Sequence, residues 1–566
     1  MSSSPDYHHR VNPDLLRRIP CNAATVLEIG CAAGQLGAAY KSLNPACRYL
    51  GVELDAAAAG EAERLLDKVW AGDVEKFQPK KLGLAPQSLD CLIYGDILEH
   101  LADPWTVLSR HVPLLKDDGV LLACIPNVQH WSILADLMQG RWQYRDEGLL
   151  DRTHLRFFTL ESVLDMLRAA GLAVLDVQAR RFNEKAFAAF YCAVEPALIN
   201  LGIDRARFQA QAGAMQYVVR ATRVPVASPL LVHSLMLKPV AACNDVRIMH
   251  VNACLATIPG VSVLQEVLKA DLSPGVDGDK IFVWQRPILT HDDRARLEAV
   301  VKAGYVVVVE FDDHPMRWPA IAQNDYLTYR GVHAVQTSTP VLGEFYRQFN
   351  PEVRVFSNQI RQLPPWREPA GGDAPLTVFF GALNREDDWK ALMPQLNQAI
   401  RRNPGRMRFE VIHDRLFFDA LETQEKRFTP TCPYPRYCEL LAGSDIALLP
   451  LQDTEFNRMK SDLKFIEAAA HGAVALASPT VYRDTLEDGV TGLLFSDANE
   501  FSGRLQQLLE DADLRLALRR HARQYVVSRR MLAPHVPGRL EWYRHLLRNR
   551  EELEEQRKAR IASMPS

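Results

Sequence analysis

A glycine-rich turn followed by an acidic residue gives this sequence a candidate site for a nucleoside. The apolar run VLEI leads into Gly30, and Gly34 follows in the next turn. Glycine allows the chain to turn tightly and to approach a ligand closely. The next apolar run, YLGVE, ends at Glu53. A carboxylate about 20 residues past such a turn can accept both hydroxyls of a ribose. We therefore predict that these three residues bind a nucleoside.

Four segments in the same order resemble class I S-adenosylmethionine-dependent methyltransferases. The string Glu28-x-Gly30-x-x-x-Gly34 is similar to the first motif of that family and differs from the GxGxxG of dinucleotide folds. The later segments AGDVEKF, DCLIYGDILEHLADPW and LKDDGVLLACIPN match further motifs. The resemblance implies a Rossmann-like α/β domain with S-adenosylmethionine as cofactor. Its implied cofactor-binding residues are Glu28, Gly30, Gly34, Glu53, Asp73 and Asp96.

Two histidines are candidates for the base of the implied methyl transfer. The cofactor brings the activated methyl group, and the protein positions the acceptor and removes its proton. The segment DRTHLRFF resembles one found in small-molecule and sugar methyltransferases, and it contains His154. His154 and His100 are candidate catalytic residues because imidazole titrates near neutral pH. In the alternative interpretation, His100 packs against the cofactor and His154 caps a helix or bonds a carboxylate.

A second candidate site lies in the segment SDLKFIEAAAHGAVALAS. Glu467 falls inside an apolar helical run, where a buried carboxylate needs a partner. Lys464 and Lys460 are expected one and two turns earlier on the same helix face, and a lysine there meets a diphosphate as a point charge. With EDGVTGLLF downstream, the segment resembles the donor site of GT-B glycosyltransferases of the glycogen-synthase-like, retaining type. The resemblance implies that Glu467 holds the ribose of a nucleotide sugar.

The beginning of the same block supports this resemblance, with two departures. FFGALNREDDWKAL is similar to the first strand and glycine turn of the nucleotide domain, which implies roles for Gly381 and Arg385 near the diphosphate. The first glutamate of the family's usual pair is replaced by Met459. The amino-terminal Gly-Gly loop is missing, since HVNACLATIPGVS offers only Gly260.

The acidic pair in EFDDHP follows a β-branched run, VVVV, and is expected at the end of a strand. We interpret Asp312 as a catalytic-side residue that contacts the acceptor, or as part of a structural turn. A metal role for Asp312 and Asp313 is the less favoured alternative, and no metal site is expected elsewhere.

Alternating apolar runs and amphipathic stretches divide the chain into three α/β blocks. We predict a methyltransferase domain over 1–223, a linker over 224–245 and a GT-B acceptor domain over 246–365, which should open with the strand VRIMHV. A donor domain over 366–548 and a solvated charged tail over 549–566 complete the chain. The Pro- and Gly-containing segment 363–375 marks the last boundary between blocks.

Composition excludes several classes of protein. The chain has 66 Lys and Arg against 69 Asp and Glu, a balance that argues against a nucleic-acid partner. No run approaches the roughly 18–20 apolar residues of a membrane span, and the amino terminus does not look like a signal peptide. The 10 cysteines form no CxxC pair. We expect free thiols and a cytoplasmic protein.

These observations predict a bifunctional methyltransferase and glycosyltransferase in surface polysaccharide or glycan biosynthesis. It would methylate a sugar hydroxyl and transfer a sugar from a nucleotide donor. The expected acceptor is a small molecule, a glycan or a lipid-linked glycan, with peripheral contact with a membrane surface. The alternative is a methyltransferase with a catalytically inactive, glycan-binding GT-B-like region. A pair of dinucleotide-dependent oxidoreductase domains is a further alternative, which the motif spacing disfavours. An assembly scaffold is another, which the two apparent small-molecule sites disfavour.

Overall fold

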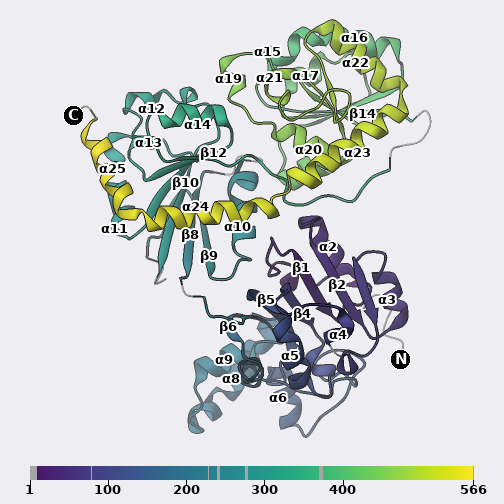
Figure 1. Cartoon of the computed structure of the whole chain (residues 1–566), viewed down its shortest axis with the longest axis vertical. Helices are drawn as coiled ribbons and strands as arrows, with labels where there is room; N and C mark the ends of the chain where they lie inside the picture. The colour runs from purple at the N-terminus through teal and green to yellow at the C-terminus, as the bar shows by residue number, and fades with distance from the viewer. Residues whose placement is uncertain are drawn as a thin grey trace. The chain divides into compact units, whose positions relative to one another are not determined.

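The computed structural model describes residues 9–77, 79–226, 228–238, 243–273, 278–368 and 374–564. The chain forms two compact units, one of residues 1–228 and 256–261 and the other of residues 229–255 and 262–566. One sheet lies in the first unit and two lie in the second (Figure 1). The predicted boundary segment 363–375 falls partly outside the described residues.

The first unit is built on a seven-stranded sheet with the order β3-β2-β1-β4-β5-β7-β6. Strands β1 to β5 are parallel, and β7 runs antiparallel to both β5 and β6. This arrangement confirms the predicted Rossmann-like domain with an antiparallel end. The strands are β1 (Thr25–Ile29), β2 (Arg48–Glu53), β3 (Lys68–Ala71), β4 (Leu89–Gly95), β5 (Leu115–Pro126), β6 (Ala173–Arg180) and β7 (Gln216–Thr222).

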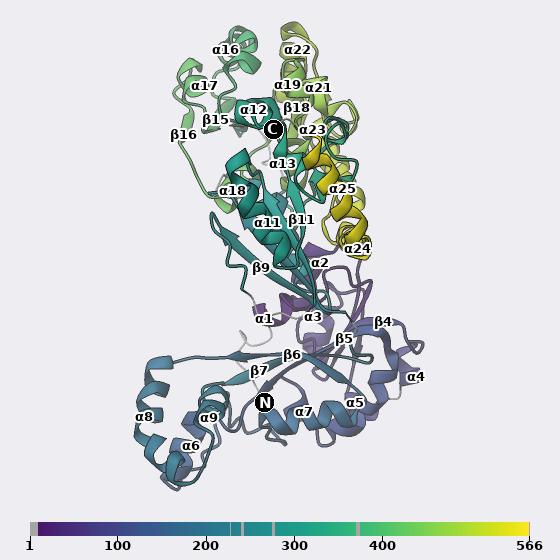
Figure 2. The ribbon, with the colours of Figure 1, turned by 90° about the vertical axis from the view of Figure 1, so that its left-hand side faces the viewer.

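Helices cover both faces of this sheet because its central strands are apolar on both sides. Successive residues of β1 point to opposite faces: Leu27 belongs to one apolar cluster and Val26 to another. The helices are α1 (Pro13–Leu16), α2 (Gln35–Leu43), α3 (Ala56–Ala62), α4 (Pro79–Leu82), α5 (Pro104–His111), α6 (Trp131–Met138), α7 (Leu160–Ala169), α8 (Glu184–Asn200) and α9 (Arg205–Ala212), with short turns η2 (Val74–Lys76), η3 (Leu98–His100) and η4 (Val112–Leu114). Helices α6, α8 and α9 gather beyond the antiparallel end of the sheet (Figure 2).

The second unit begins with a six-stranded sheet of order β13-β12-β11-β10-β8-β9. Its strands are β8 (Leu230–Met236), β9 (Val261–Val267), β10 (Asp279–Gln285), β11 (Val306–Glu310), β12 (Ala334–Thr337) and β13 (Val353–Val355). The helical elements are η5 (Asp245–Met249), α10 (His250–Leu255), η6 (His291–Asp293), α11 (Arg294–Lys302), η7 (Pro315–Arg317), α12 (Pro319–Gln323), α13 (Leu327–Arg330) and α14 (Pro340–Arg347).

The start of this sheet differs from the prediction. The expected linker 224–245 contains β8, and the expected strand VRIMHV is helical, in η5 and α10. The polar residues that interrupt β8 suggested a linker, but the structure gives them partners. The buried His233 ring contacts Glu266 at 2.8 Å and the Tyr305 hydroxyl at 3.1 Å. A buried polar side chain with partners is compatible with a core strand.

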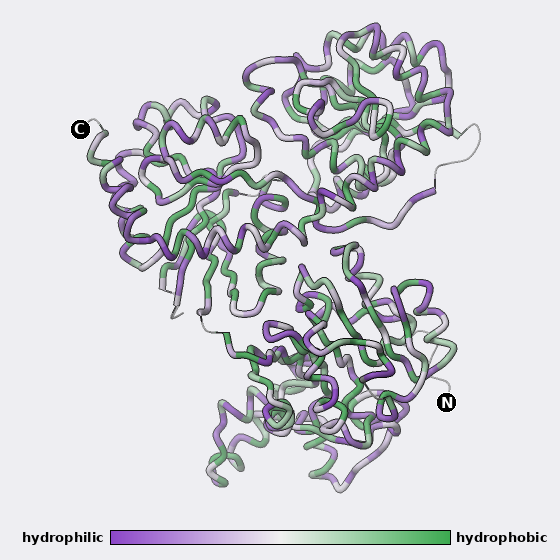
Figure 3. Tube along the Cα trace, in the orientation of Figure 1, coloured by the Kyte–Doolittle hydropathy of each residue, from purple (hydrophilic) through white to green (hydrophobic). Residues whose placement is uncertain are grey.

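The second sheet of this unit also has six strands, all parallel, in the order β16-β15-β14-β17-β18-β19. They are β14 (Leu376–Gly381), β15 (Met407–Ile412), β16 (Lys426–Thr429), β17 (Ile446–Leu449), β18 (Val474–Ala477) and β19 (Leu493–Leu494). The surrounding helices are α15 (Glu386–Trp389), η8 (Lys390–Leu392), α16 (Met393–Arg402), α17 (Arg415–Ala420), α18 (Tyr434–Ala442), α19 (Glu455–Arg458), α20 (Leu463–His471), α21 (Pro479–Tyr482), α22 (Ala498–Glu510) and α23 (Ala512–Arg529). Apolar stretches run through these strands (Figure 3).

The C-terminal helices pack on the sheet that begins with β8, although they follow the other sheet in sequence. After η9 (Ala533–His535), α24 (Val536–Arg548) lies against β10 and α25 (Arg550–Ala562) against α13 (Figure 1). The Tyr543 hydroxyl donates to Gln336 at 3.0 Å. The predicted solvated tail is therefore wrong: Arg557 is 1% exposed and is paired with Glu298 at 2.7 Å.

Candidate functional site

The glycine turn after β1 has the backbone geometry that the sequence predicted. Gly30 and Gly34 have φ angles of 74° and 82°, in the left-handed region. A side chain on Gly30 would meet Ile97 Cδ1 at 2.1 Å, so only glycine fits there. No side chain caps α2 at Gly34. The first amide groups of this helix are therefore available to a ligand, as at other helix amino termini that bind anions.

Glu53 lies at the end of β2, next to this turn. Its two carboxylate oxygens accept one backbone N–H each, from Ala32 at 2.8 Å and from Asp55 at 2.9 Å. An ionised carboxylate has about four lone-pair positions, so further acceptor capacity remains for a diol. The turn and Glu53 thus fit the nucleoside part of S-adenosylmethionine.

The structure places the other predicted acidic residues differently. Glu28 is 5% exposed and its carboxylate accepts the Tyr49 hydroxyl at 2.9 Å, within the sheet. Burial raises the pKa of Glu28 to about 8. Asp73 follows β3 and caps η2 through the amide of Glu75 at 3.0 Å. Glu28 is thus engaged inside the core, and its contact with the cofactor stays a prediction.

A cavity of about 430 Å³ opens where strands β4 and β5 end. The predicted residues Asp96, His100 and His154 line it together. Glu99, which the methyltransferase resemblance places on the cofactor side, lines it as well. Gln216 also lines it, although nothing in the sequence marked it as a site residue. A cavity at the C-terminal ends of parallel strands is the usual place for a ligand in an open α/β sheet.

Backbone hydrogen bonds bring the two histidines together from distant parts of the chain. The amides of Leu155 and Arg156 donate to the carbonyl of Glu99 at 2.8 and 3.0 Å. This holds the segment DRTHLRFF against η3. The rings of His100 and His154 consequently lie 4.7 Å apart, edge to face. Burial lowers the pKa of both histidines, so both are neutral at pH 7.

Asp96 adopts a left-handed conformation at the end of β4, with a φ of 55°. Its carboxylate accepts a hydrogen bond from Gln216 Nε2 at 2.6 Å, which comes from the antiparallel strand β7. Burial raises its pKa to about 6. A strained, partly protonated aspartate in a cavity is a common feature of functional sites.

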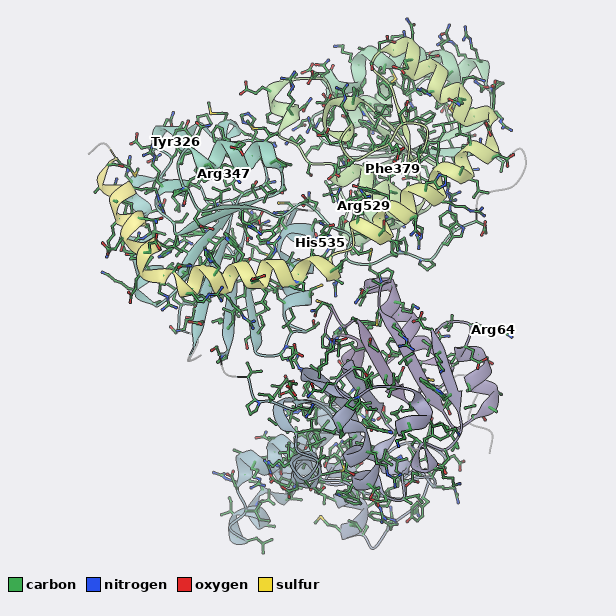
Figure 4. The ribbon with its side chains drawn as sticks, in the orientation of Figure 1. Arg64, Tyr326, Arg347, Phe379, Arg529 and His535 are labelled. Atoms are coloured by element: carbon green, nitrogen blue, oxygen red, sulfur yellow. The ribbon has the colours of Figure 1, made fainter. Side chains whose placement is uncertain are left out.

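The predicted donor residues of the second unit meet around the end of β14. The Lys464 ammonium donates to the carbonyl of Gly381. Glu467 is 2% exposed and accepts the Tyr434 hydroxyl at 2.7 Å. A side chain on Gly381 would meet the Phe379 ring at 2.7 Å, which explains the glycine; Phe379 is labelled in Figure 4. The prediction that the Glu467 carboxylate has a partner is confirmed.

The charged ends of Arg385 and Lys460 bond residues other than Lys464 and Glu467. Arg385 donates to Asn457 at 2.7 Å and pairs with Asp388 at 3.1 Å. Lys460 lies between α19 and α20, not on the helix that carries Glu467, so the predicted shared helix face is wrong. Its ammonium pairs with Asp313, at the end of β11. All the predicted donor residues with charged side chains are therefore engaged by other protein groups.

Asp312 is engaged by another protein side chain in this arrangement. It pairs with Arg286 at 2.6 Å and has a side chain 12% exposed. Burial alone would raise its pKa, but Arg286 outweighs burial and the pKa is lowered. A catalytic role for Asp312 stays a prediction.

Two tyrosines beside Glu467 went unnoticed in the sequence. Tyr434 and Tyr437 both come from α18, and both hydroxyls bond the Glu467 carboxylate. Their spacing of three residues in YPRY places them on one helix face, which was the available signal.

Comparison with known families gives one match in each of the two units of the chain. A family described as methyltransferase domain matches residues 27–121. A family described as glycosyl transferase-like matches residues 391–536. The chain joins a methyltransferase domain to a glycosyltransferase-like domain. The first match covers the glycine turn, Glu53 and His100 but not His154, and the second covers Lys464 and Glu467 but not Gly381 or Arg385.

Curated relatives match the methyltransferase domain. The ubiquinone biosynthesis O-methyltransferase of Cereibacter sphaeroides is 28% identical over 178 residues, which is 30% of this chain and 68% of the relative. A probable S-adenosylmethionine-dependent methyltransferase of Mycolicibacterium smegmatis is 27% identical over 161 residues, covering 28% of this chain and 61% of the relative. By name, both relatives are methyltransferases, which agrees with the family match over residues 27–121.

Among solved structures, a methyltransferase of Archaeoglobus fulgidus is 15% identical, with a TM-score of 0.29, over 38% of this chain and 97% of its own. TarM of S. aureus, solved with fondaparinux, alpha-GlcNAc-glycerol and UDP, is 12% identical, with a TM-score of 0.35, over 47% of this chain and 55% of its own. In the described part of the chain, no helix is both long enough and apolar enough to span a membrane.

Proposed function

We propose that the methyltransferase domain methylates a hydroxyl of a sugar or glycan acceptor. The observation that carries this proposal is the cavity lined by Asp96, His100 and His154. Ile97, which follows Asp96, lies against Gly30 of the predicted cofactor turn. The relatives in Cereibacter sphaeroides are O-methyltransferases by name, which favours oxygen as the accepting atom. A sugar acceptor is favoured because a glycosyltransferase-like domain shares the chain.

S-adenosylmethionine, when bound, supplies a methyl group on a positively charged sulfur. As the new O–C bond forms, the S–C bond breaks and the hydroxyl proton must leave. His154 and His100 are neutral at pH 7, so either can accept that proton. Asp96 and Gln216 on the same cavity wall can orient the acceptor by hydrogen bonds.

In the second unit, we propose transfer of a sugar from a nucleotide donor to a glycan or lipid-linked glycan. The cluster at the end of β14, with Lys464 and Glu467, supports it, since a lysine and a carboxylate suit a diphosphate and a ribose. Both activities in one chain suit surface polysaccharide or glycan biosynthesis in the cytoplasm, at a membrane surface that presents a lipid-linked acceptor.

One observation favours a second candidate, a glycosyltransferase-like region that binds glycan without catalysis. Lys464, Glu467, Arg385 and Lys460 are each bonded to other protein groups. Met459 also occupies the position of the family's first glutamate. A donor would have to replace several of these contacts.

A nucleotide-sugar turnover assay distinguishes the two candidates. The chain is incubated with UDP-, GDP- and dTDP-sugars, and release of nucleoside diphosphate is measured. An active enzyme releases it, and Lys464→Ala lowers the rate at least tenfold while Lys390→Ala, a change on an exposed lysine, does not. Absence of release from every donor, with nucleotide still bound, would support the binding module.

For the methyltransferase domain, formation of S-adenosylhomocysteine is measured with glycan acceptors. His154→Asn should lower the rate at least a hundredfold, in the range of general base catalysis. Methylation of nitrogen in place of oxygen, identified by mass spectrometry of the product, would contradict the proposed acceptor atom.

A further inference from the structure

Three side chains that can coordinate a metal ion lie together on one wall of the cavity in the methyltransferase domain. One ligand atom each from Glu99, His100 and His154 lies within 4.8 Å of the other two. Glu99 and His100 come from η3, and His154 comes from the loop that is bonded to the carbonyl of Glu99. All three side chains line the same cavity.

Glu99 is buried without a hydrogen-bond donor. Its side chain is 1% exposed, and no other described residue donates a hydrogen bond to either carboxylate oxygen. A buried carboxylate without a partner is costly, and a cation is the partner that would remove the cost.

The hydrogen bonds of His100 leave one ring nitrogen free to coordinate. The single hydroxyl proton of Thr153 goes to Asp151 at 2.7 Å, so Thr153 cannot donate to the ring. Nδ1 of His100, 3.3 Å from the Thr153 carbonyl, must therefore carry the ring proton. The Nε2 of a neutral His100 then has an unshared lone pair.

His154 is arranged in the same way. Its Nδ1 lies 3.2 Å from the carbonyl oxygen of Leu149, which can only accept a hydrogen bond. The ring proton is thus on Nδ1, and Nε2 carries the lone pair. Histidines that bind metals usually donate their other ring nitrogen to a carbonyl or a carboxylate, which fixes this tautomer.

We propose that Glu99, His100 and His154 bind a divalent first-row transition-metal ion, of which Zn²⁺ and Co²⁺ are suitable probes. Two imidazoles and one carboxylate favour such ions over Mg²⁺ and Ca²⁺, which prefer oxygen ligands alone. The site differs from the sequence-based expectation of no metal, which considered only the acidic pair at Asp312.

Three protein ligands leave coordination positions open toward the cavity. If the proposed methylation is correct, an acceptor hydroxyl can occupy one of them, and the ion then lowers the pKa of that hydroxyl. An imidazole that coordinates through Nε2 cannot also take a proton there. In that case His100 and His154 act as ligands, the ion activates the hydroxyl, and the hydroxyl proton passes to the Asp96 carboxylate on the same cavity wall.

The test is a calorimetric titration of the full-length, chelator-treated chain with Zn²⁺ and with Co²⁺. We expect one high-affinity ion per chain, with Co²⁺ giving visible bands that indicate nitrogen coordination. Glu99→Gln and His154→Asn should each weaken binding at least tenfold. The matched control is Glu147→Gln, a change on the same cavity wall outside the group of three.

Absence of binding, or equal affinity in Glu99→Gln, His154→Asn and the wild type, would overturn the proposal. Circular dichroism melting verifies that each variant is folded, and His154→Asn provides an independent test should Glu99→Gln fail to fold. S-adenosylmethionine is titrated separately. Its failure to bind would contradict the proposed methylation, while the metal result stands on its own.

Discussion

At the scale of single residues, the buried carboxyl of Glu28 makes a specific contribution to pH dependence. Its pKa is about 8 in the folded chain, against an ordinary value of 4.5. A raised carboxyl pKa means that the folded state holds the proton more tightly than the unfolded state. The contribution of Glu28 to the free energy of unfolding is therefore greatest below pH 4.5 and is lost as the pH rises to about 8, in total on the order of 5 kcal/mol.

Glu28→Gln should remove this dependence, because the amide cannot ionise and its oxygen can still accept the Tyr49 hydroxyl. We expect the melting temperature of the first unit to fall less between pH 5 and pH 8 in the variant than in the wild type, by scanning calorimetry. The control is Glu61→Gln, on a side chain 54% exposed. Parallel curves for Glu28→Gln and the wild type would contradict the assignment.

Residue types and spacing predicted much of the methyltransferase site. Gly30, Gly34 and Glu53 could be predicted because a tight turn and a diol-binding carboxylate require particular residues at a particular spacing. The orientation of the Glu28 side chain could not be predicted. Its partner Tyr49 lies on the neighbouring strand, and the register between the two strands is unknown from sequence. The resemblance places Glu99 on the cofactor side, but its lack of a hydrogen-bond partner is visible only in three dimensions.

At the scale of elements, a buried ion pair connects η5 to β11. Arg247 is 2% exposed and contacts Glu310 through Nε at 2.8 Å and Nη2 at 3.1 Å. Its Nη1 also donates to the carbonyl of Phe356 at 2.7 Å. Removing one partner of such a pair leaves an uncompensated buried charge, which typically costs about 3–5 kcal/mol.

Arg247→Met should therefore lower the free energy of unfolding of the second unit by about 3 kcal/mol, as measured in urea. The double variant Arg247→Met with Glu310→Gln should recover part of this loss, because residue 310 no longer carries an unpaired charge; the recovery is incomplete because Arg539, 4.0 Å from Glu310, then loses its carboxylate partner. A single variant as stable as the wild type would show that this pair does not hold η5 in place.

The start of the second unit, from β8 to α10, shows why element boundaries were harder to predict than element types. Most strands of the three sheets follow from continuous apolar runs, which buried parallel strands require. β8 was missed because His233 and Ser234 interrupt its run, and their partners Glu266 and Asn252 are distant in sequence. The helical segment of η5 and α10 was read as a strand because it begins with a short β-branched run.

At the scale of the whole molecule, the chain returns from its last sheet to an earlier one. Helices α24 and α25 follow the sheet of β14 but pack on the sheet of β8. Sequence distance hid this contact, and the many charges of α25 suggested exposure. The buried Arg557, which pairs with Glu298 and Glu554, shows that part of that charge is internal.

Arg557→Met should destabilise the second unit by about 2–3 kcal/mol, because Glu298 loses its partner, Glu554 keeps only His333 and Lys558, and a buried hydrogen-bonded group is removed. Lys558→Met, on the same helix with a side chain 57% exposed, should change stability by less than about 0.5 kcal/mol. Urea unfolding monitored by tryptophan fluorescence compares them. Equal effects of the two substitutions would mean that α25 is not packed as described.

The central claim is that one chain carries two independent ligand sites, one for S-adenosylmethionine and one for a nucleotide sugar. It is tested most directly by calorimetric titration of the purified chain with S-adenosylmethionine and then with UDP-, GDP- and dTDP-linked nucleotides, in the wild type, Glu53→Ala and Glu467→Gln. The account predicts that both classes of ligand bind and that each substitution abolishes binding of its own ligand alone. Loss of both ligands in either variant would contradict independent sites, and failure of every nucleotide to bind the wild type would contradict the donor site.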